Sequence, residues 1–360
     1  MAIDGLASVS ESLWTAATGT YMLAVVAYTG EYAFGKNGRI AQTSVPQASA
    51  DQRSVAQLGA AQASVVPAGV RKPALVGGGN SGTQLSPPPD QPRYGAGSVE
   101  SGGAAGRRWG RAAVGLTVLA AVLHLAAVAL RGIAVDRVPW GNMYEFTLVV
   151  GLMATVAWLA TLVKMPQLRY LGLFVMMPVL LVMFLAGTLY TKASKLVPAL
   201  QSFWLAIHVS SVAVAEGILL TSAAITVLYL IRARCERHAA TGSAPARFAR
   251  LGSRLPAAAS LDKAAYRTVA FAFPIYTAGV IFGAIWAEAA WGRYWGWDPK
   301  ETWAFIAWVV YATYLHARAT AGWKGNRAAY INLLGFGAMT FNFFVVNIVI
   351  SGLHSYAGLN

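Results

Sequence analysis

Long apolar segments constrain this chain more than any other feature of its sequence. Runs of about 20 mostly apolar residues recur along it, and each is long enough to cross a hydrocarbon layer roughly 30 Å thick. Only 12% of the residues are charged, whereas a soluble chain carries about a quarter. We therefore predict an all-α polytopic membrane bundle of about eight transmembrane helices, near 12–33, 112–131, 143–163, 170–190, 203–231, 268–288, 303–321 and 328–351.

The net charge of +14 is distributed unevenly between the two sides of this predicted bundle. If the N-terminus lies outside the cytoplasm and the helices alternate in direction, 22 of the 28 Lys and Arg residues fall on the cytoplasmic side. Such a bias orients helices in a bilayer. It places both termini outside the cytoplasm, and it explains the positive charge without nucleic acid as a partner.

Residues 36–110 differ in composition from the rest of the chain. They contain seven of the 15 prolines and stretches such as SPPPDQP and VGGGNSG. We expect a flexible cytoplasmic linker here, between an N-terminal transmembrane helix in 1–35 and a seven-helix membrane domain in 111–360. The single cysteine, Cys235, allows neither an intrachain disulfide nor a CxxC redox pair. Any thiols in the chemistry of this protein therefore belong to other molecules.

Half of the 12 tryptophans lie in or beside one loop, which we expect on the outer face at 286–303. An aromatic belt at a membrane interface spreads its rings over many helix ends, whereas this density favours a flat apolar ligand such as a porphyrin. Basic side chains in the loop can donate charge-assisted hydrogen bonds to propionates. We call the candidate haem-binding residues of this loop the Trp shelf: Trp291, Arg293, Trp295, Trp297, Asp298, Lys300 and Trp303.

Asp298 also has a structural interpretation. In the stretch DPKE, Asp298 stands at a helix N-cap position, Pro299 at the first helical position and Glu301 three residues after the cap. This pattern is a capping box, which fixes the start of a helix. We expect the capping role to be the main one, and hence a mild effect of Asp298→Asn, because Asn also caps helices well.

Two histidines are expected at the same outer level of the membrane. His208 lies near the outer end of the fifth predicted helix, and His354 closes the eighth. Neutral imidazole is a common axial ligand of haem iron, so we predict that these two residues bind a haem. The alternative, two interfacial histidines hydrogen-bonded to nearby groups, stays open.

His316 and His124 are expected at depths that differ by roughly 10 Å, given a rise of 1.5 Å per helical residue. They are therefore poorly matched as mutual ligands, and His316 is expected to take a second ligand from a partner protein. For His124 a hydrogen bond between helices is favoured. Glu145 and Glu216 are candidates to orient a histidine ligand by accepting its second N–H.

The stretch WGRYWGWDPKETW at 291–303 resembles the WWD motif of the haem-handling membrane proteins of cytochrome c maturation. Together with His208 before it, His316 and His354 after it and WGNMYEF at 140–146, it makes residues 112–360 similar to the CcsA/ResC-type subunit of the System II cytochrome c synthetase. In actinobacteria this subunit is often labelled CcsB.

This resemblance implies that haem b is bound as a substrate at the outer side of the bacterial plasma membrane. His208 and His354 would be its axial ligands there, and His316 would bind haem in a membrane site shared with a ResB/CcsB-type membrane partner. An apocytochrome c would offer the two thiols of a CxxCH motif, kept reduced by thiol-reducing proteins, to the haem vinyl groups. The chain would thus be part of a cytochrome c haem lyase. A haem exporter without ligase activity and a b-type electron-transfer subunit are the alternatives.

Overall fold

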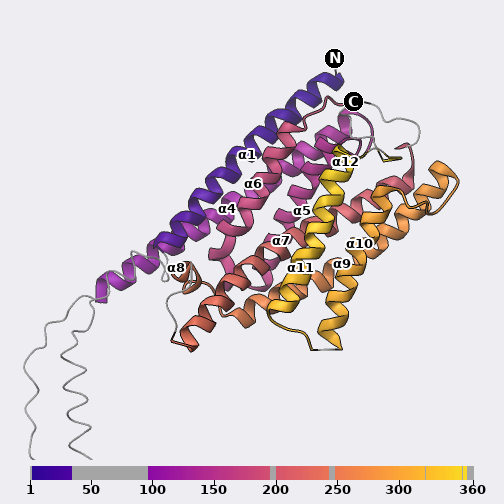
Figure 1. The fold of residues 1–360 in the computed structure, drawn as a ribbon. Coiled ribbons are helices and arrows are strands. Elements are labelled where there is room, and N and C mark those ends of the chain that lie inside the picture. Colours follow the sequence, from indigo (N-terminus) through magenta and orange to yellow (C-terminus); the bar gives the residue numbers. More distant parts are fainter. Residues whose placement is uncertain are drawn as a thin grey trace, which may run out of the picture.

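The computed structural model describes residues 2–34, 96–194, 200–242, 248–320, 322–350 and 352–354. Within them the chain forms helices and no strand. The long helices are α1 (Ala2–Phe34), α4 (Ala96–Ala134), α5 (Met143–Lys164), α6 (Gly172–Thr188), α7 (Phe203–Ala240), α9 (Ala258–Trp291), α10 (Pro299–Ala319) and α11 (Asn326–Thr340). They pack into one bundle, and the start of α1 and the short helix α12 (Val346–Ile348) lie at the same end of it (Figure 1).

Six helical stretches among the described residues are long and apolar enough to cross a membrane: Ala104–Ala134, Met143–Lys164, Pro166–Thr188, Phe203–Ala240, Ala258–Trp291 and Asn326–Ile348. The predicted all-α, multi-pass membrane architecture is therefore confirmed. The other two predicted spans, 12–33 and 303–321, correspond to α1 and α10, which are not among these six; α10 ends at Ala319. α10 is rich in Trp and Tyr, residues typical of membrane interfaces.

The predicted linker ends earlier than expected, because α4 already begins at Ala96. α1 packs along α4 (Figure 1), and a Cβ added to Gly30 would lie only 2.6 Å from the Trp109 indole. This close approach is possible because Gly30 has no side chain. Trp109, which was predicted to belong to the linker, is thus part of a helix that packs against α1. The rest of the predicted linker, residues 36–95, lies outside the described part of the chain.

A buried ionic cluster joins the end of α4 to the start of α5. The Glu145 carboxylate accepts hydrogen bonds from Arg131 (3.1 Å), Arg137 (2.7 Å) and the Gly141 N–H (2.8 Å). Glu145 and Arg131 are each 1% exposed. The carboxylate is thus fully used by these donors, and Glu145 does not orient a histidine, which corrects the role considered for it from the sequence.

We expect Glu145→Ala to lower the free energy of unfolding by about 3–5 kcal/mol, because it leaves two guanidinium groups buried without their counter-charge. Thermal unfolding of the purified protein in detergent measures this. Glu236→Ala is the matched control, since the more exposed Glu236–Arg232 pair on α7 should contribute about 0–1 kcal/mol. Equal unfolding temperatures for the two variants would contradict the structural role of Glu145.

Candidate functional site

The Trp-rich loop is shorter than expected and is anchored at the start of α10. Residues 292–298 connect α9 to α10, so Trp286 and Trp291 belong to the last turns of α9. Asp298 accepts a hydrogen bond from the Lys300 N–H (3.2 Å), and Glu301 accepts one from the Asp298 N–H (3.1 Å). The predicted capping box, with Pro299 in the first turn, is confirmed.

Asp298 also contacts the C-terminal segment. Its carboxylate accepts hydrogen bonds from His354 Nδ1 and from the Leu353 N–H, both at 2.8 Å. A Cβ on Gly352 would lie 2.7 Å from Asp298 Oδ1, so this close approach depends on glycine. Burial alone would raise the pKa of the Asp298 carboxyl, but these hydrogen bonds and the one from the Lys300 N–H lower it to about 2. Asp298 is therefore an ionised acceptor at physiological pH.

This contact determines which nitrogen of His354 carries the proton. An ionised carboxylate only accepts hydrogen bonds, so Nδ1 must be the donor. In a neutral imidazole the lone pair is then on Nε2. Hydrogen bonding of one ring nitrogen to a carboxylate is the common arrangement behind metal-binding histidines. The residue that orients His354 is thus Asp298, not Glu145 or Glu216.

His208, in the second turn of α7, is held in the same tautomer by a different partner. Its Nδ1 lies 2.7 Å from the Gly279 carbonyl oxygen on α9. A carbonyl can only accept, so Nδ1 donates and Nε2 keeps its lone pair. α9 approaches the ring so closely that a Cβ on Gly283 would lie 2.7 Å from Nδ1. A glycine at 283 is therefore what allows the imidazole to reach its acceptor.

The two histidines lie around one buried indole. The Trp286 ring is 6.2 Å from the His208 ring and 5.7 Å from the His354 ring, measured between centroids. Trp291 contacts His354 from the side, at 5.0 Å. The expectation that the two imidazoles come together at one end of the bundle, next to the tryptophans, is therefore confirmed.

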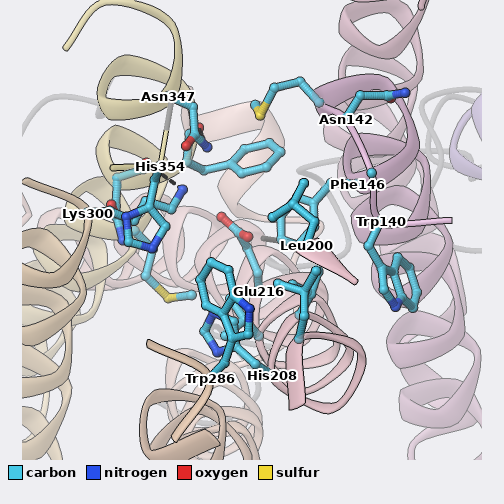
Figure 2. A pocket seen from close by; sticks show the side chains of 18 of the residues that line it. Trp140, Asn142, Phe146, Leu200, His208, Glu216, Trp286, Lys300, Asn347 and His354 are labelled. Carbon is cyan, nitrogen blue, oxygen red and sulfur yellow. Dashed lines mark hydrogen bonds between the residues drawn. The ribbon is translucent and has the colours of Figure 1, made fainter. Parts of the chain in front are cut away.

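A cavity of about 890 Å³, including its open mouth, lies beside these rings. Figure 2 shows His354, Lys300 and Asn347 on one side, Trp140 and Asn142 on the other, and His208 and Trp286 at the base. Glu216 projects between them and faces Lys300. The remaining lining residues are mostly apolar and come from five helices and their loops: Gly141, Met143, Phe146, Leu200, Leu205, Val209, Val212, Tyr276, Met339, Asn342 and Phe343.

A second cavity, of about 560 Å³, adjoins the first on the side of the Trp-rich loop. His208, Trp286, Lys300 and His354 line both cavities. The second cavity adds Tyr294 and Trp295 to the wall, among other residues. The two imidazoles therefore lie in the wall that the two cavities share.

Some residues of the predicted Trp shelf line the two cavities, and others do not. Lys300 lines both cavities and donates to the Asn342 carbonyl at 3.2 Å. Arg293 pairs instead with Glu301, at 3.4 Å. Trp303 packs on Phe341, with ring centroids 4.1 Å apart, and lines neither cavity.

Trp297 is the exception in exposure and in backbone conformation. Its side chain is 65% exposed, and its φ of 58° lies in the left-handed region. For a bulky residue that conformation costs roughly 1–2 kcal/mol. The indole contacts the rings of Trp295 and Phe305, at centroid distances of 5.8 and 6.0 Å.

The two remaining membrane histidines do not come near this site. His124 is fully buried between α1, α4 and α5, with the Tyr21 hydroxyl 3.3 Å from Nδ1, so the favoured hydrogen bond between helices is confirmed. His316 is exposed in the last turns of α10. The two side chains therefore lie in different surroundings, His124 inside the bundle and His316 on its surface.

Several lining residues were not singled out from the sequence. Asn142 carries a recognisable signal, because a polar residue before MYEF is typical of a helix N-cap, and its side chain does accept the Glu145 N–H at 2.9 Å. Leu200, Tyr276 and Asn347 carry none, since only the packing of distant helices brings them to the cavity.

Together these features define a class of protein: a polytopic membrane bundle with paired, pre-oriented histidines and a tryptophan-rich loop at one end. The chain belongs to the cytochrome c assembly protein family, whose sequence profile matches residues 140–354. This match confirms the resemblance drawn from the WWD motif and the histidines.

Relatives named cytochrome c biogenesis protein CcsA share this similarity. The protein from Guillardia theta is 38% identical over 264 residues, which is 68% of this chain and 85% of the relative. That from Synechococcus elongatus is 38% identical over 199 residues, covering 46% of this chain and 61% of the relative. That from Chlamydomonas reinhardtii is 40% identical over 169 residues, covering 47% and 45%.

Proposed function

We propose that this chain acts in cytochrome c biogenesis by holding haem b as a substrate and presenting it to apocytochrome c, as the CcsA-type subunit of a System II synthetase. One observation carries the proposal. His208 and His354 reach one cavity from two different parts of the chain, and each has its Nδ1–H committed to an acceptor and its Nε2 lone pair available. That is the state in which imidazole binds haem iron.

The other residues of the site suit the remaining parts of a haem. Lys300 is placed to meet a propionate, and the apolar lining of the first cavity and Trp295 of the second suit the porphyrin plane. Attachment adds the two CxxCH thiols across the two vinyl groups to form thioethers. The protein contributes by holding the reactants together, which is a proximity effect rather than acid–base catalysis.

The thiols and a membrane partner come from outside this chain. The lone Cys235 lies 27 residues further along α7 than His208, or about 40 Å at 1.5 Å per residue. The charge bias supports a site outside the cytoplasm, in our proposal at the bacterial plasma membrane. Exposed side chains on α10, Phe305, Val309 and His316, suit a second membrane haem site completed by a ResB-type partner.

Co-expression tests this function. The full chain and its ResB-type partner are produced with a reporter apocytochrome carrying one CxxCH motif. We expect haem that remains on the reporter after denaturation and acid–acetone extraction. Haem that reaches the reporter compartment but is fully extractable would instead mean export without attachment. If the protein is stably produced but no haem reaches the reporter compartment, the role in haem handling is contradicted.

A further inference from the structure

Glu216 is a buried carboxylate that the proposed function leaves without a role. It projects from α7 into the larger cavity, two turns below His208, and is 5% exposed. Among the described residues, none donates a hydrogen bond to it. Burial without such donors disfavours the ionised carboxylate, so the charge of Glu216 depends on a cation inside the cavity.

Lys300 is that partner, and it stands across the cavity from Glu216 (Figure 2). Of the described residues that line this cavity, Lys300 is the only Lys or Arg and Glu216 the only Asp or Glu. No contact within 4.0 Å joins the two groups, and the ammonium donates to the Asn342 carbonyl instead. The carboxylate and the ammonium therefore attract each other across open space that a ligand can enter.

No other Lys or Arg is among the described residues that line the cavities bordered by Glu216. Glu216 also borders an apolar cavity of about 1060 Å³ between α5, α6, α7 and α11, whose described lining contains no basic residue. Tyr276, which lines the first cavity with Glu216, donates its hydroxyl to the Ala304 carbonyl instead. His208 and His354 are committed through Nδ1 to other acceptors. Within the described lining of the first cavity, Lys300 is thus the one cationic partner for both Glu216 and an anionic ligand.

We infer that Glu216 limits how tightly the cavity holds haem, by competing with a haem propionate for Lys300. This inference rests on the proposed function. A propionate that pairs with Lys300 takes this counter-charge away from Glu216. Glu216 must then either take up a proton or repel the propionate in the low-dielectric chamber, and either change opposes haem binding. A protein that hands haem on must release it, and release is faster when part of the binding is opposed. Glu216 is therefore an affinity-setting residue, not a catalytic one.

Glu216→Gln tests the inference, because it removes the charge while keeping the shape. The full chain is purified with its partner, loaded with haem b, and the rate of haem transfer to excess apomyoglobin is measured. We expect the Glu216→Gln protein to release haem at least ten-fold more slowly than the wild type. Release at the wild-type rate, or faster, would overturn the inference.

Two comparisons show whether the effect passes through Lys300 and a propionate. Haem dimethyl ester has no free propionates, so Glu216→Gln should leave its release rate unchanged. In the double variant Glu216→Gln/Lys300→Met, which removes both charges together, release of haem b should not be slowed. Slower release of the ester, or in the double variant, would mean that Glu216 acts by packing and would also overturn the inference.

His208→Ala, measured beside these variants, distinguishes a failure of the proposed haem site from a failure of the role of Glu216. If it changes haem release, the haem lies in this cavity and the Glu216 result stands on its own. If it leaves release unchanged, the haem is elsewhere, and both the proposed site and the role of Glu216 fall.

Discussion

His208→Ala and His354→Ala are each expected to abolish holocytochrome formation and to lower haem retained by the purified protein at least ten-fold. Each removes one imidazole Nε2 that the structure has already oriented, through Gly279 for His208 and Asp298 for His354. The loss should appear as a fall in the haem absorbance per protein and a changed spectrum, because an axial ligand is missing.

Added imidazole should partly restore haem binding in both variants, since a small free ligand can occupy the space left by the side chain. His238→Ala is the matched control, because His238 lies near the other end of α7, in the last turn of that helix. Wild-type haem content in either His208→Ala or His354→Ala would rule out the axial role of that residue.

Asp298→Asn is expected to reduce haem retention by about 10–100-fold, the range typical for removing a partner that orients a metal-binding histidine. This expected loss of haem is larger than the mild effect predicted from helix capping alone, because the structure shows that Asp298 also contacts His354. Asp298 Oδ2 accepts hydrogen bonds from the Lys300 N–H and from His354 Nδ1, and Oδ1 accepts one from the Leu353 N–H. Asn still caps α10 when its one amide oxygen takes the Oδ2 position, but its NH2 group then faces the Leu353 N–H, and a neutral oxygen is a weaker acceptor than a carboxylate. His354 is therefore held less firmly, both through its ring and through the segment that carries it.

Two variants, Asp298→Asn and Glu301→Gln, distinguish the orientation of His354 from the capping of α10. The haem spectrum and the unfolding temperature are measured for both. Glu301 completes the same capping box, accepts the Gly296 N–H and pairs with Arg293, but does not contact His354. We expect similar losses of stability in the two variants and a much larger loss of haem in Asp298→Asn. Equal haem loss in both would reduce Asp298 to its capping role.

The sequence predicted the helices and the pairing of the two histidines because both follow from local patterns. Apolar runs determine where helices cross a membrane, and alternation of direction places His208 and His354 at the same end. The capping box at Asp298 is likewise local, contained within four residues. Such features need no knowledge of how distant segments pack.

Contacts between distant segments could not be predicted in this way. The Asp298–His354 hydrogen bond joins residues 56 positions apart. Glu145 turned out to bind Arg131 and Arg137, because the turn before α5 folds back on the end of α4. Trp303 was assigned to the Trp shelf because it lies among the other tryptophans, yet it packs on Phe341. Phe341 begins the π-helical turn Phe341–Val345, which no sequence pattern predicted.

Asp298 ties three segments of the site to one carboxylate: the loop 292–298, the start of α10 and the segment 352–354. His208 depends on a separate contact, from α7 to the Gly279 carbonyl on α9. α9 and α10 are themselves joined, because the Tyr276 hydroxyl donates to the Ala304 carbonyl and the Trp308 indole donates to the Thr277 hydroxyl. Both imidazoles are therefore mounted on one connected frame, so the spacing between the two rings is set before any flat guest enters the cavity.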